Sequence, residues 1–140
     1  MALGPGAVVA VRFRQFGATG GFFWSLPWTL DGPERDPTVW FREFGEEPIA
    51  EQEPLSGFLT QFSLFEASMG ADYLAPTRKL TAPQVEQLTE PLHLVPLRPI
   101  WPWAPTHFYV APSLVMHVSS EDGEAFDAWA GVTHRSAWTR

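Results

Sequence analysis

Histidine, serine and cysteine are the side chains whose spacing most often reveals an active site or a metal site. The four histidines, His93, His107, His117 and His134, form no His-Glu-x-x-His motif, and no serine lies in a Gly-x-Ser-x-Gly motif. His107 and His117 flank one expected hairpin turn, but two imidazoles alone are a weak metal signal. The absence of cysteine removes thiolate nucleophiles, cysteine zinc sites and disulfides. We therefore expect a protein that is not an enzyme and holds no metal or other cofactor.

Carboxylates are abundant, and five of the sixteen are clustered in residues 43–53. This stretch holds five glutamates: Glu43, Glu46, Glu47, Glu51 and Glu53. Because Pro48 and Pro54 lie among them, we expect an extended acidic connection. A row of carboxylates on such a segment would steer a basic partner and speed its encounter with the protein, although an ordinary solvated loop explains the pattern equally well. Glu66, beside an apolar helical stripe, is better explained as a boundary residue that reaches water than as a buried acid.

Two tryptophans form a second candidate binding feature. Trp101 and Trp103 alternate with prolines in the segment Arg-Pro-Ile-Trp-Pro-Trp-Ala-Pro, residues 98–105, so their rings would be presented in an extended conformation. Exposed tryptophan is a common hot spot at protein interfaces. The alternative is that one or both rings cap the core, and we expect one buried and one partly exposed. The predicted partner-binding residues are thus the five glutamates with Trp101 and Trp103.

Composition and charge narrow the class of partner. The chain has 140 residues, 45% of them apolar and 18% charged, which fits one globular domain. Nine Lys and Arg against sixteen Asp and Glu give a net charge of −7, which repels nucleic-acid phosphates and favours a basic protein, or simply aids solubility. The apolar run at residues 7–11 lacks the basic start and length of a secretory signal, and no run approaches the roughly 20 residues of a membrane span. We expect a soluble, cytoplasmic protein with no membrane partner, as a monomer or weak dimer.

Hydrophobic periodicity predicts an α+β fold with a mostly antiparallel, twisted sheet. Strands are expected at residues 8–16, 22–26, 38–44, 92–97, 107–111, 114–119 and 125–132. The whole chain, residues 1–140, is expected to form a single domain, with a frayed tail at residues 134–140.

One long amphipathic helix and one short helix should pack on this sheet. The long helix spans residues 55–69, with apolar side chains at helical spacing: Leu55, Phe58, Leu59, Phe62, Phe65 and Met69. Its opposite face carries Thr60, Gln61, Ser63 and Ser68. The short helix begins at a capping-box pattern, Thr81 with Gln84, and ends before Pro91.

Two short motifs resemble a known family. Asp36-Pro37-Thr38-Val39-Trp40 is followed, after the acidic segment, by Ser56-Gly57-Phe58-Leu59 at the start of the long helix. Over residues 22–70 this resembles the SUKH superfamily of bacterial immunity and interaction proteins, whose members often show a D-P-x-V-W strand and then an S-x-x-x-F-L helix. Members usually carry helices before the first strands, whereas this chain begins almost at once with an expected strand.

The resemblance implies a role in binding rather than catalysis. SUKH proteins keep one α+β scaffold and vary its surface to bind different toxins, many of them nucleases with basic surfaces that would suit the charge of −7. Neutralisation would then occur because the acidic face covers the toxin's active or substrate site. Two other hypotheses remain open at this point. They are a regulatory or scaffold interaction module without a toxin partner, and an enzyme with a small-molecule pocket lined by Trp24, Trp28 and Trp40.

Overall fold

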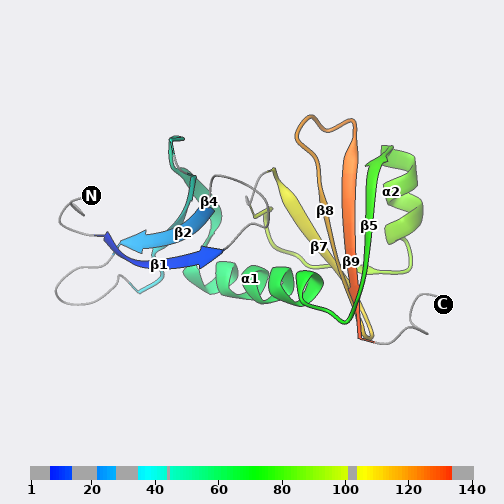
Figure 1. Ribbon diagram of the computed structural model, residues 1–140, viewed down its shortest axis with the longest axis horizontal. Helices are drawn as coiled ribbons and strands as arrows, with labels where there is room; N and C mark the ends of the chain where they lie inside the picture. Colours follow the sequence, from blue (N-terminus) through cyan, green and yellow to red (C-terminus); the bar gives the residue numbers. More distant parts are fainter. Residues whose placement is uncertain (1–6, 14–21, 28–34, 44, 101–103, 134–140) are drawn as a thin grey trace. The chain divides into compact units, whose positions relative to one another are not determined.

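The computed structural model describes residues 7–13, 22–27, 35–43, 45–100 and 104–133, with the backbone alone for 7–13 (Figure 1). Its antiparallel strands form two sheets and are accompanied by two helices, which confirms the α+β class. The chain divides into two compact units, Met1–Phe58 and Leu59–Arg140. The single domain stays a prediction, and the expected tail at residues 134–140 lies outside the described residues. No helix in the described ranges has the length and apolarity needed to cross a membrane.

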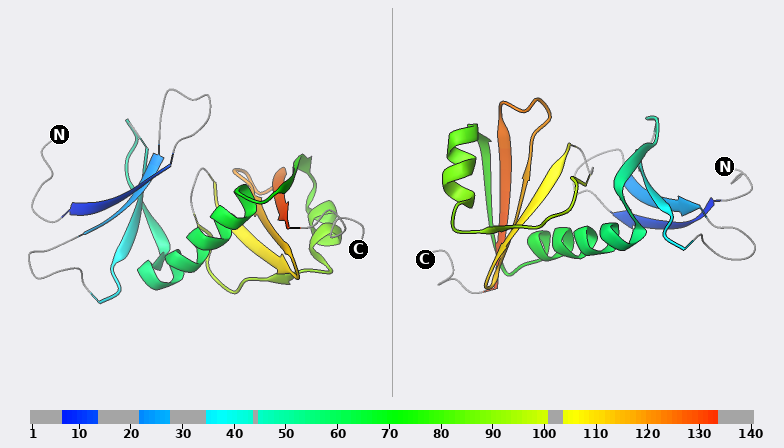
Figure 2. Two further views of the ribbon diagram at one scale, coloured as in Figure 1. Left: turned by 60° about the horizontal axis from the view of Figure 1, so that its bottom comes forward. Right: turned by 180° about the vertical axis from the view of Figure 1, so that it is seen from behind.

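The first unit is a four-stranded antiparallel sheet in the order β1-β2-β3-β4 (Figure 2). Its strands are β1 (Ala7–Phe13), β2 (Phe22–Pro27), β3 (Thr38–Glu43) and β4 (Ile49–Pro54). Alternate side chains of β2 and β3 are buried, as expected for a sheet with one covered face. Trp24 stands opposite Phe41 across the two strands, and its ring centroid lies 5.3 Å from that of Phe58 at the start of helix α1 (Leu55–Met69).

The second unit is a five-stranded antiparallel sheet in the order β5-β9-β8-β7-β6. Its elements are β5 (Tyr73–Leu80), α2 (Ala82–Thr89), β6 (His93–Leu94), β7 (Thr106–Ala111), β8 (Leu114–Ser119) and β9 (Phe126–Val132), with the part of α1 from Leu59 onward. The predicted capping box of α2 is confirmed, because Thr81 N–H donates to Gln84 Oε1 at 2.8 Å and Gln84 N–H donates to Thr81 Oγ1 at 3.3 Å.

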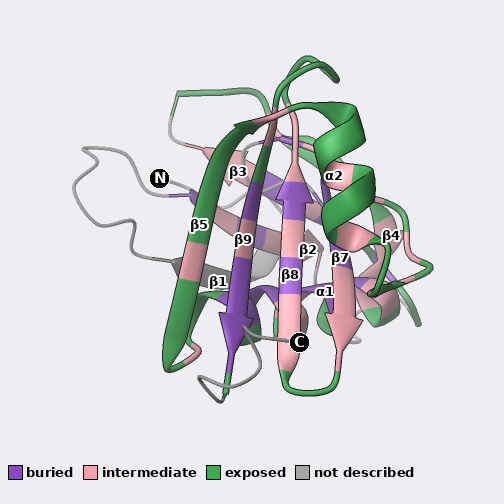
Figure 3. Cartoon of the chain, turned by 90° about the vertical axis from the view of Figure 1, so that its right-hand side faces the viewer, coloured by how far each residue is buried: buried purple, intermediate pink, exposed green. Residues whose placement is uncertain are grey.

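Each face of this second sheet is covered. On one face, the buried side chains of β8 and β9 are Met116, Val118, Ala128 and Ala130. Partly buried side chains, including Val85 of α2, pack against them. On the other face, Phe65 and Ser68 of α1 contact His117 and Trp129. Figure 3 shows buried residues along β9 and in part of β8, and a mostly exposed β5 beside them.

The buried face of α1 differs from the expected one. The helix has the predicted bounds, but Gln61 and Ser68 are 1% and 0% exposed, whereas Leu59 and Met69 are 52% and 38% exposed. The buried positions 58, 61, 65 and 68 form one stripe of the helix. Hydrogen bonds offset part of the cost of burying these two side chains. Gln61 Nε2 donates to the Arg98 carbonyl and Ser68 Oγ donates to the Phe65 carbonyl, while Gln61 Oε1 has no hydrogen-bond partner among the described residues.

Two strands of the structure, β4 and β5, were not predicted from the sequence. The acidic connection contains β4, which pairs with β3, and residues 73–80 form β5, which pairs with β9. Glu, Gln, Lys and Pro are poor strand formers, so their pairing with a neighbouring strand overrides local propensity. The strand expected at residues 92–97 is shorter, because only His93–Leu94 pairs with β7.

Candidate protein-binding surface

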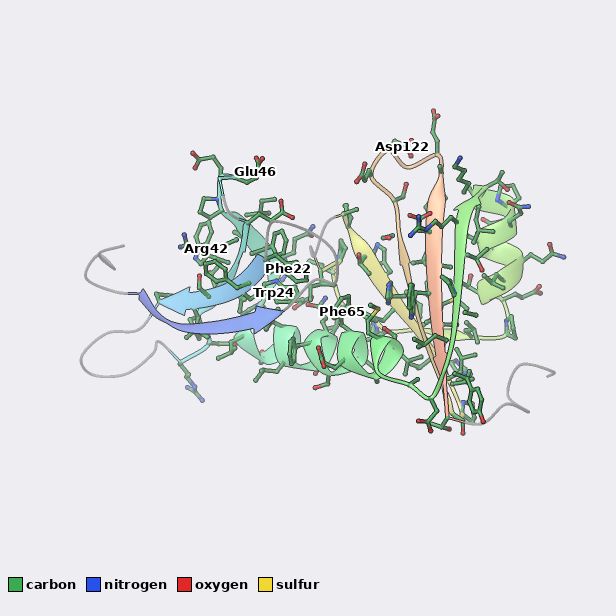
Figure 4. All side chains as sticks on the ribbon, in the orientation of Figure 1. Phe22, Trp24, Arg42, Glu46, Phe65 and Asp122 are labelled. Carbon is green, nitrogen blue, oxygen red and sulfur yellow. The ribbon has the colours of Figure 1, made fainter. Side chains whose placement is uncertain are left out.

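Three of the predicted glutamates gather at the turn of the β3–β4 hairpin. Glu43 ends β3 and is half-buried, while Glu46 and Glu47 are exposed. Figure 4 shows Glu46 at the end of the hairpin, pointing away from the sheet. The turn depends on Gly45, whose φ of 80° lies in the left-handed region that glycine adopts without strain. We call Glu43, Glu46 and Glu47 the acidic tip.

The acidic tip has no cationic counterpart within the described ranges. Neither an ion pair nor a hydrogen bond joins its carboxylates to a lysine or arginine there. The neighbouring Arg42 is engaged elsewhere, since its Nε donates to Ser25 Oγ at 2.7 Å. Glu46 and Glu47 are exposed, and a group of exposed charges of one sign would attract a partner of the opposite charge.

Glu51 lies in the interior of the first unit, which corrects the expectation that it belongs to a solvent-facing row. It is 5% exposed, and Trp24 Nε1 donates to its Oε1 at 2.7 Å. Glu53 is half-buried, and its side chain lies so close to Gly57 that an added Cβ there would be 2.8 Å from Glu53 Oε2. Because side chains alternate along a strand, residues 51 and 53 of β4 share the inner face. Recognising a strand at residues 49–54 would have separated these two from Glu46 and Glu47.

A hydrogen-bonded clasp closes the base of the same hairpin. The carboxylate of Asp36, just before β3, accepts Ser56 N–H at 2.9 Å and Ser56 Oγ–H at 2.8 Å. The Pro37 carbonyl accepts Leu55 N–H at 2.9 Å. Asp36 thus caps α1 from another segment and complements the positive end of the helix, which has no acidic residue in its first turn. The clasp joins the start of β3 to the end of β4 and so supports the strands that present the acidic tip.

The sequence patterns did not predict a contact between a serine and a histidine in the second unit. His117 Nδ1 lies 2.9 Å from Ser68 Oγ, and Ser68 Oγ also donates to the Phe65 carbonyl at 2.9 Å. Because the hydroxyl has one proton, both bonds are satisfied when Nδ1–H of His117 donates to Ser68. The rings of Phe65, Phe108 and Trp129 surround the imidazole, and the resulting loss of water lowers the pKa of His117 to about 4.

This contact attaches α1 to the sheet and does not present a nucleophile. Ser68 is fully buried, so a substrate has no access to its hydroxyl. Trp129 Nε1 donates to the Ser68 carbonyl at 3.2 Å, and a Cβ at Gly131 would lie 2.6 Å from that same oxygen. Ser68 and Gly131 are both small, which lets α1 and β9 approach closely. Because the two residues are distant in sequence, local patterns do not reveal that they meet.

The other expected sites separate in space or fall outside the described ranges. His107 stands opposite Val118, and Phe108 stands opposite His117, so the two histidines lie on opposite faces of their sheet. In the ranges that the structure describes, no three His, Asp or Glu side chains are grouped as metal ligands. Trp24 and Trp40 likewise face opposite sides, since they pair with Phe41 and Ser25. Trp28, Trp101 and Trp103 lie outside the described residues.

Comparisons with protein-family models, with curated proteins and with solved structures found no match. The resemblance to the SUKH superfamily therefore stays a prediction that depends on two short motifs. Those motifs contact each other through Asp36 and Ser56 at the base of the β3–β4 hairpin.

Proposed function

We propose that this chain is a non-enzymatic protein-binding domain that neutralises a basic bacterial toxin through its acidic tip. The observation that carries the proposal is the exposure of Glu46 and Glu47, whose own carboxylates meet no lysine or arginine within the described ranges. The net charge of −7 extends the attraction for a cationic surface beyond the hairpin. The toxin assignment itself comes from the resemblance to immunity proteins.

The hairpin suits electrostatic docking because its base is held. The clasp of Asp36 with Ser56 and the bond from Leu55 N–H to the Pro37 carbonyl restrict the strands that present the tip. A surface ordered before binding loses less conformational entropy when the partner arrives. The acidic tip would occupy the cationic surface that the toxin uses for its own substrate.

The first test is protection in cells. Basic bacterial toxin domains are expressed in cells with and without the full chain, and survival is measured. Protection against one of them, together with a complex of the two purified proteins, supports the proposal. A purified partner that binds the acidic tip but harms no cell would instead favour a regulatory or scaffold module.

The second test measures how the acidic tip affects association with the purified partner. The double variant Glu46→Gln with Glu47→Gln removes two negative charges and should slow association roughly 3- to 10-fold at low salt, with little effect at high salt. The matched control, Glu121→Gln with Glu124→Gln, removes two exposed charges from the β8–β9 turn. That turn is also ordered, because Asp122 Oδ1 accepts the N–H of Glu124 at 2.8 Å. Equal slowing by both double variants would mean that only net charge matters and that the tip is not the docking site.

A further inference from the structure

Strand β5 is an exposed edge of the second sheet. Among the described strands it pairs with β9 alone, and every residue in it except Ala75 and Leu80 is exposed (Figure 3). Tyr73 and Leu74 are 42% and 43% exposed, which is high for large apolar side chains in a strand. An edge of this kind presents backbone groups that can pair with another strand.

The backbone direction along β9 shows which groups of β5 point outward. Thr133 N–H, just after β9, donates to the Ser113 carbonyl beside β8 at 3.2 Å. Backbone N–H and C=O groups alternate in direction along a strand, so those of residues 128, 130 and 132 point toward β5. These three residues stand opposite Thr77, Ala75 and Tyr73. Leu74 and Pro76 therefore direct their backbone groups away from β9. Pro76 has no N–H, so the outward N–H within this part of the edge belongs to Leu74.

The two charges that flank this edge would face charges of opposite sign if two copies of β5 paired with each other. Asp72 precedes the strand and Arg78 lies near its end; both are exposed, and neither takes part in an ion pair in the described segments. If two β5 strands run antiparallel and cross at Ala75, Asp72 of each copy stands opposite Arg78 of the other. The same register places Leu74 opposite Pro76, so the outward N–H of Leu74 meets the outward carbonyl of Pro76. Opposite charges at facing positions stabilise a strand pair.

We propose that β5 is a self-association edge, at which two copies of this chain pair β5 with β5, antiparallel about Ala75, to form one continuous sheet. The partner is a second copy because Asp72 of each copy then faces Arg78 of the other, which gives one pair of opposite charges on each side of the two-fold axis. This surface lies in the second unit and is distinct from the acidic tip.

The same geometry limits the strength of the pairing. Each Leu74–Pro76 pair contributes one hydrogen bond instead of two, because Pro76 cannot donate. The register with β9 shifts between Thr77 and Leu80, and Lys79 there has a φ of 59°, which bends the strand and shortens the usable edge. The dimer is therefore weak and depends on concentration, and its register depends on the two ion pairs.

Sedimentation velocity of the full chain, over about a hundredfold range of protein concentration, tests the proposal. The wild type should shift from monomer to dimer as its concentration rises. Asp72→Arg alone places two arginines opposite each other, and Arg78→Asp alone places two aspartates opposite each other, so each should raise the dissociation constant about tenfold or more. The double variant Asp72→Arg with Arg78→Asp restores opposite charges and should dimerise like the wild type.

Mixing the two single variants gives the sharpest result. The Asp72→Arg copy is positive at both flanking positions and the Arg78→Asp copy is negative at both, so the two copies complement each other on each side of Ala75. The mixture should therefore form a heterodimer at concentrations at which each variant alone is largely monomeric. The control Glu86→Arg changes an exposed charge on α2 and should leave the dimer unchanged. A sedimentation coefficient independent of concentration, single variants that dimerise normally, or a mixture that stays monomeric would each overturn the proposal.

Discussion

Protonation of His117 should make the fold sensitive to acid. Burial lowers the pKa of His117 from 6.5 to about 4, so between these two values the unfolded chain binds a proton that the folded chain does not. The stability contributed by the neutral imidazole is fully present above pH 6.5 and is lost as the pH falls toward 4. A difference of 2.5 pKa units corresponds to a loss of up to about 3 kcal/mol in the free energy of unfolding.

The measurement is urea unfolding of the full chain, followed by circular dichroism at several pH values between 7 and 4. Carboxylates also titrate toward the lower end of this range, so the informative quantity is the difference between the wild type and His117→Gln. The variant should be less stable at neutral pH, because it loses ring contacts with Phe65 and Trp129, but its stability should fall less on acidification. His107→Gln, at an exposed position of the same sheet, is the matched control and should follow the wild type.

The result that would refute this reasoning is a wild-type curve parallel to that of His117→Gln across the whole range. The imidazole would then take up a proton as readily in the folded chain as in the unfolded one, and the enclosure by Phe65, Phe108 and Trp129 would not govern its charge. A curve for His107→Gln that follows the His117 variant would equally contradict it, since the side chain at position 107 is exposed.

Three substitutions test the packing that positions the candidate surfaces, and all are measured by urea unfolding. Gly131→Ala places a methyl group 2.6 Å from the Ser68 carbonyl oxygen and should destabilise the protein by about 1–3 kcal/mol; unchanged stability would show that α1 can move away from β9. Asp36→Ala and Ser56→Ala should each lower the free energy of unfolding by about 1 kcal/mol, because each removes part of the clasp at the start of α1. The loss in the double variant should be clearly smaller than the sum of the two single losses. Additive losses would mean that the two side chains act independently.

Local patterns in the sequence were sufficient for the elements whose signals lie within a few residues. The helix at residues 55–69 follows from apolar spacing, and the start of α2 follows from Thr81 and Gln84, whose mutual hydrogen bonds span three residues. The strands around the Ser113 turn follow from alternation and turn residues. The α+β class follows from these elements, because both the 3.6-residue and the 2-residue period are present in one chain.

What the sequence alone could not decide is which polar groups find partners far along the chain. Gln61 and Ser68 are buried because the Arg98 carbonyl and His117 meet them, and Glu51 is buried because Trp24 donates to it. Local periodicity assigns polar residues to solvent by default, since burial without a hydrogen bond is unfavourable. The tertiary structure lowers that penalty by supplying a partner for Gln61 Nε2, Ser68 and Glu51, and it thereby decides which glutamates stay exposed and which strand is left as an edge.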